Sequence, residues 1–149
     1  MQTGDIRDDN VFPFKGPFKG KGQNRKALRQ LEMEMAEIQE LMLETVNEFN
    51  LVFKTPRLIN LRILKRSGYP LLWWRKAERS GSYIRLFHSD EGALIVGKLL
   101  PVAKQKVIDF DKKRLHLNFR ATVIGNTIES YKRYDDGINV LAEALCQNQ

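Results

Sequence analysis

Two long stretches in which apolar residues recur at helical spacing constrain the fold more than any other feature. The first runs from residue 24 to residue 49, and its apolar stripe consists of Leu28, Leu31, Met35, Ile38, Met42 and Phe49. The second runs from residue 102 to residue 134, and its stripe consists of Ala103, Val107, Phe110, Leu117, Ala121, Ile124, Ile128 and Tyr131. Spacings of three, four or seven residues predict one apolar face on each helix.

These two faces need apolar partners. The first has only three heptads and methionine at two seam positions, so it would form a weak coiled coil with a second chain. We expect it to pack on the second long helix, with pairing to a second copy as the alternative, so a monomer and a homodimer both stay open. Asn24 is a plausible N-cap for the first helix. Asp135, Asp136 and Gly137 predict the end of the second, before a short helix over 138–145.

Residues 57–88 lie between the long helices and predict a three-stranded meander. The clearest strand is 71–75, which is rich in bulky and aromatic residues, and turns are expected around Gly68 and Gly81. The alternative for 57–65 is a helix that begins at Thr55-Pro56. A short helix over 90–98 follows. The predicted fold is α+β and mainly α, with two long helices packed on a small antiparallel β-meander in a single domain over 23–149.

Residues 1–22 differ in composition from the rest of the chain. A tandem Pro-Phe-Lys-Gly motif places Phe12, Phe14 and Phe18 among prolines, glycines and lysines, which excludes a helix there. Because aromatic residues are unusual in a flexible tail, we expect the three phenylalanines to dock. They would pack either on the protein's own core or on a partner.

The charge of the chain is unevenly placed. The net charge is +7, from 25 basic and 18 acidic residues. Residues 31–50 contain six acids and no base, 51–88 contain nine bases and one acid, and 112–120 contain four bases and no acid. Such blocks favour a one-sided surface for an anionic partner, although solubility alone would also account for the excess.

No catalytic, cofactor or metal signature is found in the sequence. Gly16 to Gly22 lacks the spacing of a phosphate-binding P-loop. His88 and His116 lack metal-ligand spacing, and the lone cysteine, Cys146, excludes an internal disulfide. There is no signal peptide pattern and no long apolar run, so we expect a cytoplasmic protein without membrane contact, cofactor or enzymatic activity.

The predicted hairpin carries the strongest functional pattern. Strand alternation places one mixed set of aromatic and basic side chains on a common face, with two further cations near the second turn. The set is Trp73, Arg75, Tyr83, Arg85 and Phe87, and the cations are Lys76 and Arg79. Aromatic rings can stack on unpaired bases while guanidinium groups hold phosphates. The alternative is a purely structural Arg–aromatic surface, or one that the second long helix covers.

A second basic element lies on the second long helix. Lys106, Lys113 and Arg120 recur every seven residues and form a line with Lys112 nearby. A line of cations can follow a phosphate backbone, but lysine and arginine stems also commonly cover an apolar seam.

The runs GYPLLWWRK (68–76) and GSYIRL (81–86) between the two long helices resemble small uncharacterised proteins encoded on integrative conjugative elements and plasmids of proteobacteria. The resemblance covers about residues 55–125 and implies a role in DNA maintenance, transfer or regulation. We expect a non-catalytic accessory protein that binds DNA or RNA. The alternative is a protein-interaction module, a subunit or inhibitor of a nucleic-acid-processing complex, anchored by the phenylalanines of the N-terminal arm.

Overall fold

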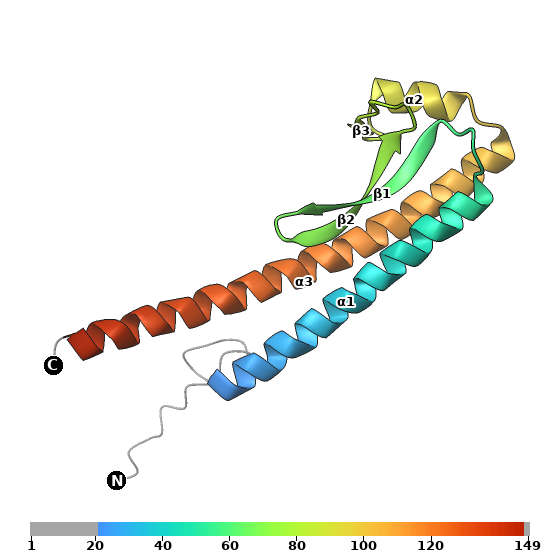
Figure 1. Ribbon diagram of the computed structural model, residues 1–149. Helices are drawn as coiled ribbons and strands as arrows, with labels where there is room; N and C mark the ends of the chain where they lie inside the picture. Colours follow the sequence, from blue (N-terminus) through green and yellow to red (C-terminus); the bar gives the residue numbers. More distant parts are fainter. Residues whose placement is uncertain (1–20, 148–149) are drawn as a thin grey trace, which may run out of the picture. The chain divides into compact units, whose positions relative to one another are not determined.

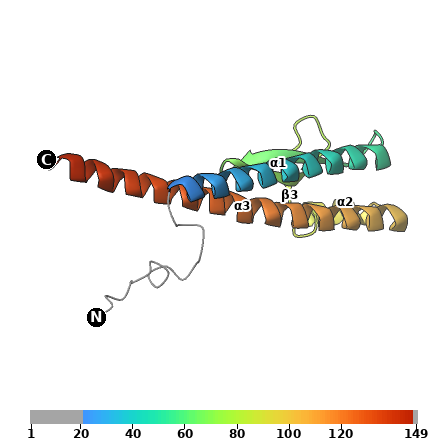
Figure 2. The ribbon, with the colours of Figure 1, turned by 90° about the horizontal axis from the view of Figure 1, so that it is seen from below.

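The computed structural model describes residues 21–147, and side chains from Asn24 onward. Its elements are α1 (Lys21–Val52), β1 (Ile59–Arg66), β2 (Tyr69–Lys76), β3 (Tyr83–Ile84), α2 (Asp90–Gly97) and α3 (Pro101–Gln147). The three strands form an antiparallel sheet in the order β1-β2-β3, and α1 and α3 run side by side (Figures 1 and 2). The predicted α+β, mainly helical fold is confirmed.

The chain divides into two compact units. The sheet unit contains residues 35–125, and the helix-pair unit contains the described parts of 1–34 and 126–149. The predicted single domain over 23–149 is therefore spread over two units. None of the helices over 21–147 combines the length and the apolar character that a bilayer crossing needs.

The hairpin between β1 and β2 is closed by a two-residue turn. Ser67 and Gly68 both have positive φ, at 53° and 86°, which is the pattern of a type I′ turn. That turn matches the twist of antiparallel strands and fixes the register that pairs Arg66 with Tyr69 and Ile63 with Leu72. Residues 59–66 are thus a strand, and the helix considered for 57–65 is not formed.

The core of the sheet unit is built on the inner face of the sheet. Leu61, Leu72 and Trp74 are almost completely buried there. The Trp74 ring meets Phe49 of α1 edge-on at 5.4 Å between centroids, and Phe49 meets Phe110 of α3 at the same distance. Offset and edge-on contacts of this kind add to the free energy gained from burying the rings.

Two polar side chains of α3 attach the helix to β2. Asn118 accepts a hydrogen bond from the Leu72 backbone N–H at 2.7 Å and donates one to the Leu72 carbonyl oxygen at 2.9 Å. Asp111 accepts from Trp74 Nε1 at 2.8 Å and from Arg114 Nε at 2.7 Å. Arg114, which interrupts the apolar stripe in the sequence, is thus paired with a carboxylate at the edge of the core.

The third strand is shorter than the predicted segment, 83–87. It pairs only Trp74 with Ile84 and Arg75 with Tyr83. Farther along β2 the backbone groups of Leu72 are bonded to Asn118, so a longer third strand would have no free partner there. The chain turns instead, and Ser89 caps α2 by accepting a hydrogen bond from the Gly92 N–H.

Two helical boundaries differ from the sequence prediction. α3 does not end at Asp135–Gly137 but continues to Gln147 as one helix. A glycine inside a helix costs about 1 kcal/mol relative to alanine, which a cooperative helix of this length can absorb. Asn24 is not an N-cap, because α1 begins at Lys21. It lies instead inside the helix-pair unit, buried, and donates through Nδ2 to Asp135 Oδ1 at 3.3 Å.

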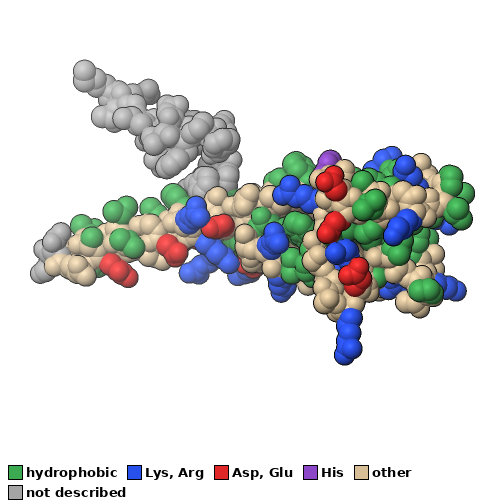
Figure 3. All heavy atoms as spheres, turned by 90° about the horizontal axis from the view of Figure 1, so that it is seen from above, with side chains coloured by type: hydrophobic (Ala, Val, Ile, Leu, Met, Phe, Trp, Pro, Cys, Tyr) green, Lys and Arg blue, Asp and Glu red, His purple; other side chains and the backbone are tan. Residues whose placement is uncertain are grey.

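The helix-pair unit consists only of the first turns of α1 and the last turns of α3. Leu28 and Leu31 are half-buried on α1, as Ile128 is on α3, and Tyr131 is buried. The last part of α3 is different, since every residue from Asp136 to Gln147 is exposed. Figure 3 shows hydrophobic side chains gathered along this end of the helix.

Candidate nucleic-acid interface

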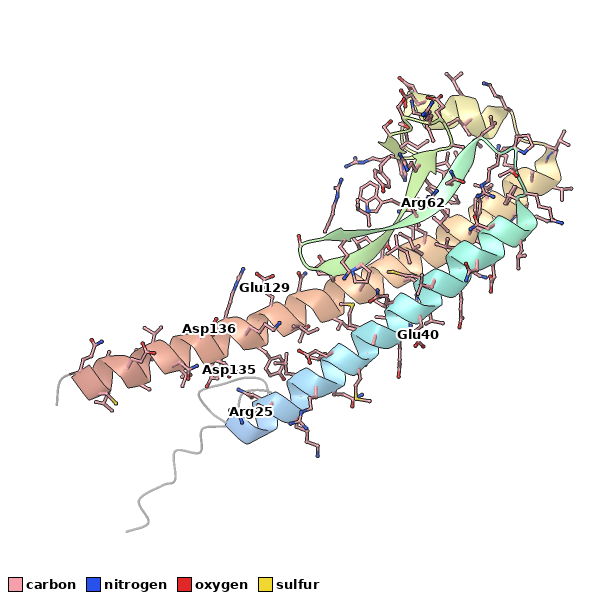
Figure 4. The ribbon with its side chains drawn as sticks, viewed as in Figure 1. Arg25, Glu40, Arg62, Glu129, Asp135 and Asp136 are labelled. Atoms are coloured by element: carbon pink, nitrogen blue, oxygen red, sulfur yellow. The ribbon has the colours of Figure 1, made fainter. Side chains whose placement is uncertain are left out.

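The face of the sheet that points away from the core carries the candidate interface. We call it the outer face. It consists of Asn60, Arg62, Leu64, Arg66, Leu71, Trp73, Arg75 and Tyr83. Tyr69, which the register also sets on this side opposite Arg66, has its ring against Gly125 of α3 instead. Figure 1 shows both long helices on one side of the sheet, and Arg62 is labelled on β1 in Figure 4. Arg62, Arg66 and Tyr83 are exposed, so the second long helix does not cover this face. The outer face has three arginines and no acidic side chain.

Trp73 lies at the centre of the outer face. The guanidinium carbon of Arg66 lies 4.5 Å from the centroid of the Trp73 ring, and Tyr83 meets the same ring edge-on at 6.4 Å. Trp73 is half-buried, and its Nε1 is buried with no hydrogen-bond partner in the described part of the chain. A buried donor without an acceptor is uncommon in folded proteins and costs stability.

Arg75 is held in a defined orientation beside Tyr83. Its Nε donates to the Gly81 carbonyl oxygen at 2.7 Å, and its guanidinium carbon lies 5.9 Å from the centroid of the Tyr83 ring. The hydrogen bond uses one of the five N–H groups of the guanidinium. The side chain is half-buried, so its position is fixed before any ligand arrives.

An open hollow adjoins the outer face at Trp73. It is lined by Trp73, Trp74, Ile84, Arg85, Leu86, Phe87, His88 and Arg114. Arg85 is exposed, and Phe87 is 37% exposed. The structure thus brings Arg85 and Phe87 to the border of the outer face, as the sequence pattern indicates, although Phe87 follows the strand rather than belonging to it.

The two cations predicted near the second turn are placed differently from each other. Arg79 is exposed in the loop between β2 and β3. Lys76 lies opposite Ile59 in the register, on the other face from Arg75, and forms an ion pair with Glu91 of α2 at 3.4 Å. Lys76 is therefore not part of the outer face.

The line of cations on α3 lies apart from the outer face. Lys113 pairs with Glu48 of α1 at 2.8 Å. Asp111 faces the sheet, because it accepts a hydrogen bond from Trp74. Lys113 is two residues farther along, about 200° around the helix, and so points away from the sheet. Lys106 and Lys112 are exposed, and Arg120 is half-buried. The two basic elements do not merge into one surface.

Arg62 and Arg66 belong to the interface but were missed by sequence reasoning. Ile59, Leu61 and Ile63 alternate along β1 and mark its buried face in the sequence. The same alternation places Arg62 and Arg66 on the opposite face, so the signal was present in the sequence. What it does not contain is the register that sets Arg62 against Trp73.

The remaining predicted sites contribute nothing to the outer face. Phe12, Phe14 and Phe18 lie outside the described residues. Within residues 21–147 no three histidine, cysteine, aspartate or glutamate side chains gather as a metal ion would require. The chain matches no protein-family model, no curated protein and no solved structure.

Proposed function

We propose that this protein is a non-catalytic nucleic-acid-binding accessory protein that holds the phosphate backbone on the outer face of its sheet. The observation that carries the proposal is the composition of that face. Three arginines surround two aromatic rings there, with no acidic side chain among them. The resemblance to proteins of mobile genetic elements supports an accessory role in DNA maintenance or transfer.

Phosphate binding would use Arg62, Arg66 and Arg75 together with Arg85. Guanidinium groups form charge-assisted, bidentate hydrogen bonds with phosphate oxygens. Arg75 is already oriented by its bond to Gly81, so it loses little conformational freedom on binding. Arg62 and Arg66 are exposed and can turn toward successive phosphates.

Stacking of unpaired bases would use Tyr83 and Phe87 rather than Trp73. The Trp73 ring is already contacted by Arg66 and by Tyr83. Tyr83 and Phe87 are 39% and 37% exposed. If Arg66 turned to a phosphate, a base or phosphate oxygen could reach Trp73 and give its unpaired Nε1 an acceptor.

The α3 cations have a smaller part in this proposal. The charge of Lys113 is partly balanced by Glu48, and exposed acids also follow α1 at Glu37, Glu40 and Glu44. A phosphate backbone near that side of the sheet unit would meet both signs of charge. We therefore assign the main phosphate contacts to the outer face and only auxiliary ones to Lys106, Lys112 and Arg120.

Fluorescence anisotropy with labelled single- and double-stranded DNA and RNA tests the proposal. We expect binding that weakens steeply with salt, and the slope of log K against log salt should fall by about 1 for each phosphate contact removed. The test variant is Arg62→Gln with Arg66→Gln. The matched control is Lys98→Gln with Lys104→Gln, two exposed cations away from the outer face. Equal slopes for the two double variants, with both folded by circular dichroism, would reject the outer face as the site.

Tyr83→Leu tests base stacking separately. Loss of a stacked base costs about 1–3 kcal/mol in single-strand affinity, while duplex affinity should stay the same because paired bases are not accessible. Equal losses for single and double strands would show that Tyr83 supports the arginines and does not stack.

A second candidate, a protein-interaction module, is favoured by one observation. Leu115, Phe119 and Val123 recur every four residues on α3 and are 55%, 68% and 47% exposed. Exposed apolar stripes of this kind mark protein contacts. A purified partner that binds the protein but not its Phe119→Ser variant, with nucleic-acid affinity unchanged, would establish this function.

A further inference from the structure

The apolar seam of α3 continues beyond the part of α1 that it packs against. Ile128 and Tyr131 lie in the helix-pair unit, and the same three-and-four spacing then gives Asp135, Ile138, Ala142 and Leu145. Asp135 is bonded to Asn24, near the start of α1. Figure 2 shows α3 extending past the first residues of α1. Beyond Asp135, the residues of the continued seam therefore have no helix of the described chain beside them.

We call the apolar strip of Ile138, Leu141, Ala142 and Leu145 the terminal strip. Ile138, Leu141 and Leu145 are 42%, 67% and 69% exposed. Burying a leucine or isoleucine side chain is worth a substantial part of the stability of a small unit, so an apolar strip of this kind indicates a missing occupant.

The charge around the terminal strip indicates which occupant fits. Residues 134–147 contain Asp135, Asp136 and Glu143 and no basic residue. Residues 12–20, which lead directly into α1, contain two lysines and no acid, together with Phe12, Phe14 and Phe18. An apolar and basic segment is therefore joined to the helix beside an apolar and acidic strip. A second copy of α3 would instead bring its own three acids against these three, which disfavours pairing between two terminal strips.

The length of the arm also fits. Ile138 and Leu145 are about 10 Å apart along the helix at 1.5 Å per residue, a distance that three or four extended residues can span. Phe18 can thus reach any part of the terminal strip from the start of α1. Phe12 and Phe14 can reach it with one reversal, and the Gly16-Pro17 pair is suited to a turn.

A polar group at the start of the strip supports the same occupant. Asn24 is only 1% exposed, and its Oδ1 has no hydrogen-bond partner among residues 24–147. A buried carbonyl oxygen of this kind normally accepts a hydrogen bond. A hydrogen-bond donor brought by the bound arm would supply the missing partner.

We propose that residues 12–20 of the N-terminal arm bind along the terminal strip of the same molecule, with the phenylalanines on the apolar residues and Lys15 and Lys19 near the acids. The arm would then continue the seam beyond the first residue of α1. This inference is independent of nucleic-acid binding, and it removes the phenylalanines as free anchors for a partner protein.

Cys146 gives a direct test, because it is the sole cysteine, is exposed and lies at the end of the terminal strip. A nitroxide spin label on Cys146 should broaden the amide NMR signals of residues 12–20 in the full-length protein. The test variant, Leu141→Ser with Leu145→Ser, should abolish the broadening. Val140→Ser is the matched control, because Val140 is 63% exposed in the same turn but points to a different side of the helix.

Three results would overturn the proposal. The first is the absence of broadening in the wild-type protein, and the second is broadening that persists in the Leu141→Ser, Leu145→Ser variant. The third is broadening that appears only in a mixed sample, in which one protein carries the spin label and the other carries the isotope label without a spin label. That result would show that the arm of one molecule binds the terminal strip of a second copy. If the α3 variant loses helix by circular dichroism, Phe14→Ser with Phe18→Ser gives the same test without changing the helix.

Discussion

The two units of this protein contain parts of the same two helices, α1 and α3, but the contacts that pack the helices together differ between the units. In the sheet unit, α1 and α3 share a core of large aromatic rings with a three-stranded sheet, and Phe49, Trp74 and Phe110 are buried there. In the helix-pair unit there is no sheet, and the seam contains leucine, isoleucine and one tyrosine around the polar pair of Asn24 and Asp135. Equal helix patterns in the sequence thus lead to very different amounts of burial.

The difference shows what polar side chains do in each setting. Asn118 and Asp111 bond to groups of β2 that would otherwise be buried without partners, so they are required by the sheet. The hydrogen bond given for the side chains of Asn24 and Asp135 joins them to each other. Both residues occupy seam positions that apolar residues could fill. A polar pair at a seam position specifies register more than it adds stability.

The largest expected effect comes from removing the central ring of the sheet unit. Trp74→Ala should lower the free energy of unfolding by about 3–5 kcal/mol, because it leaves a cavity and removes the hydrogen bond to Asp111. Urea unfolding followed by circular dichroism measures this loss. Leu58→Ala, at an exposed position of the same unit, should change stability little. Similar losses for both variants would contradict a core centred on Trp74.

Asn118→Ala should have the next largest effect. It leaves the backbone N–H and carbonyl oxygen of Leu72 without partners, at about 1–3 kcal/mol for each group that water cannot reach. Hydrogen exchange of the Leu72 amide should accelerate while that of Ile38 on α1 changes only with global stability. Asn126→Ala, an exposed asparagine on the same helix, serves as the control. Unchanged protection at Leu72 would mean that another group replaces Asn118.

In the helix-pair unit, replacing the polar pair should act in the opposite direction. Asn24→Leu with Asp135→Leu should leave stability unchanged or raise it, because it removes the desolvation cost of a partly buried polar pair. Each single variant should be less stable than the double variant, since it leaves one polar group unpaired. Thermal unfolding of the four proteins forms a double-mutant cycle, and additive single effects would show that the two side chains are not coupled.

The smallest effect concerns pH. Burial raises the pKa of the Tyr131 hydroxyl above its ordinary value of 10.0. The unfolded chain therefore loses this proton first, so the stability that the neutral hydroxyl provides is present below pH 10 and declines as pH rises through the higher pKa of the folded state. Tyr131→Phe should flatten the decline measured by chemical unfolding between pH 9 and pH 11. An identical slope in wild type and variant would exclude Tyr131 as the cause.

Much of the fold follows from local sequence patterns. The stripes of α1 and α3 and the alternation in 57–76 are local signals, and they predict the elements that the structure contains. The predicted stop at Asp135–Gly137 was wrong because turn-forming residues act weakly inside a long cooperative helix. The short third strand depended on Asn118, whose partner Leu72 lies 46 residues away. Local patterns carry no information on such a contact.

The candidate interface was predicted only in part. Alternation placed Trp73, Arg75 and Tyr83 on one face, and the structure brings them together. Alternation puts Lys76 on the opposite face from Arg75, where it pairs with Glu91, and Lys113 pairs with Glu48. Both ion pairs depend on how separate elements are placed in space. Charge counts along the chain therefore indicate a basic surface without showing which cations remain available to a ligand.

The contact of Asn118 with β2 also bears on the behaviour of the protein at high concentration. An uncovered strand edge is a template on which strands of other molecules add, and proteins commonly block such edges. Asn118 blocks the edge of β2 beyond the short β3. The strand at the other edge of the sheet, β1, carries Arg62, Lys65 and Arg66. The sheet is thus closed to growth by a side chain on one edge and by positive charge on the other, and neutralising both would open both edges to strands of other molecules.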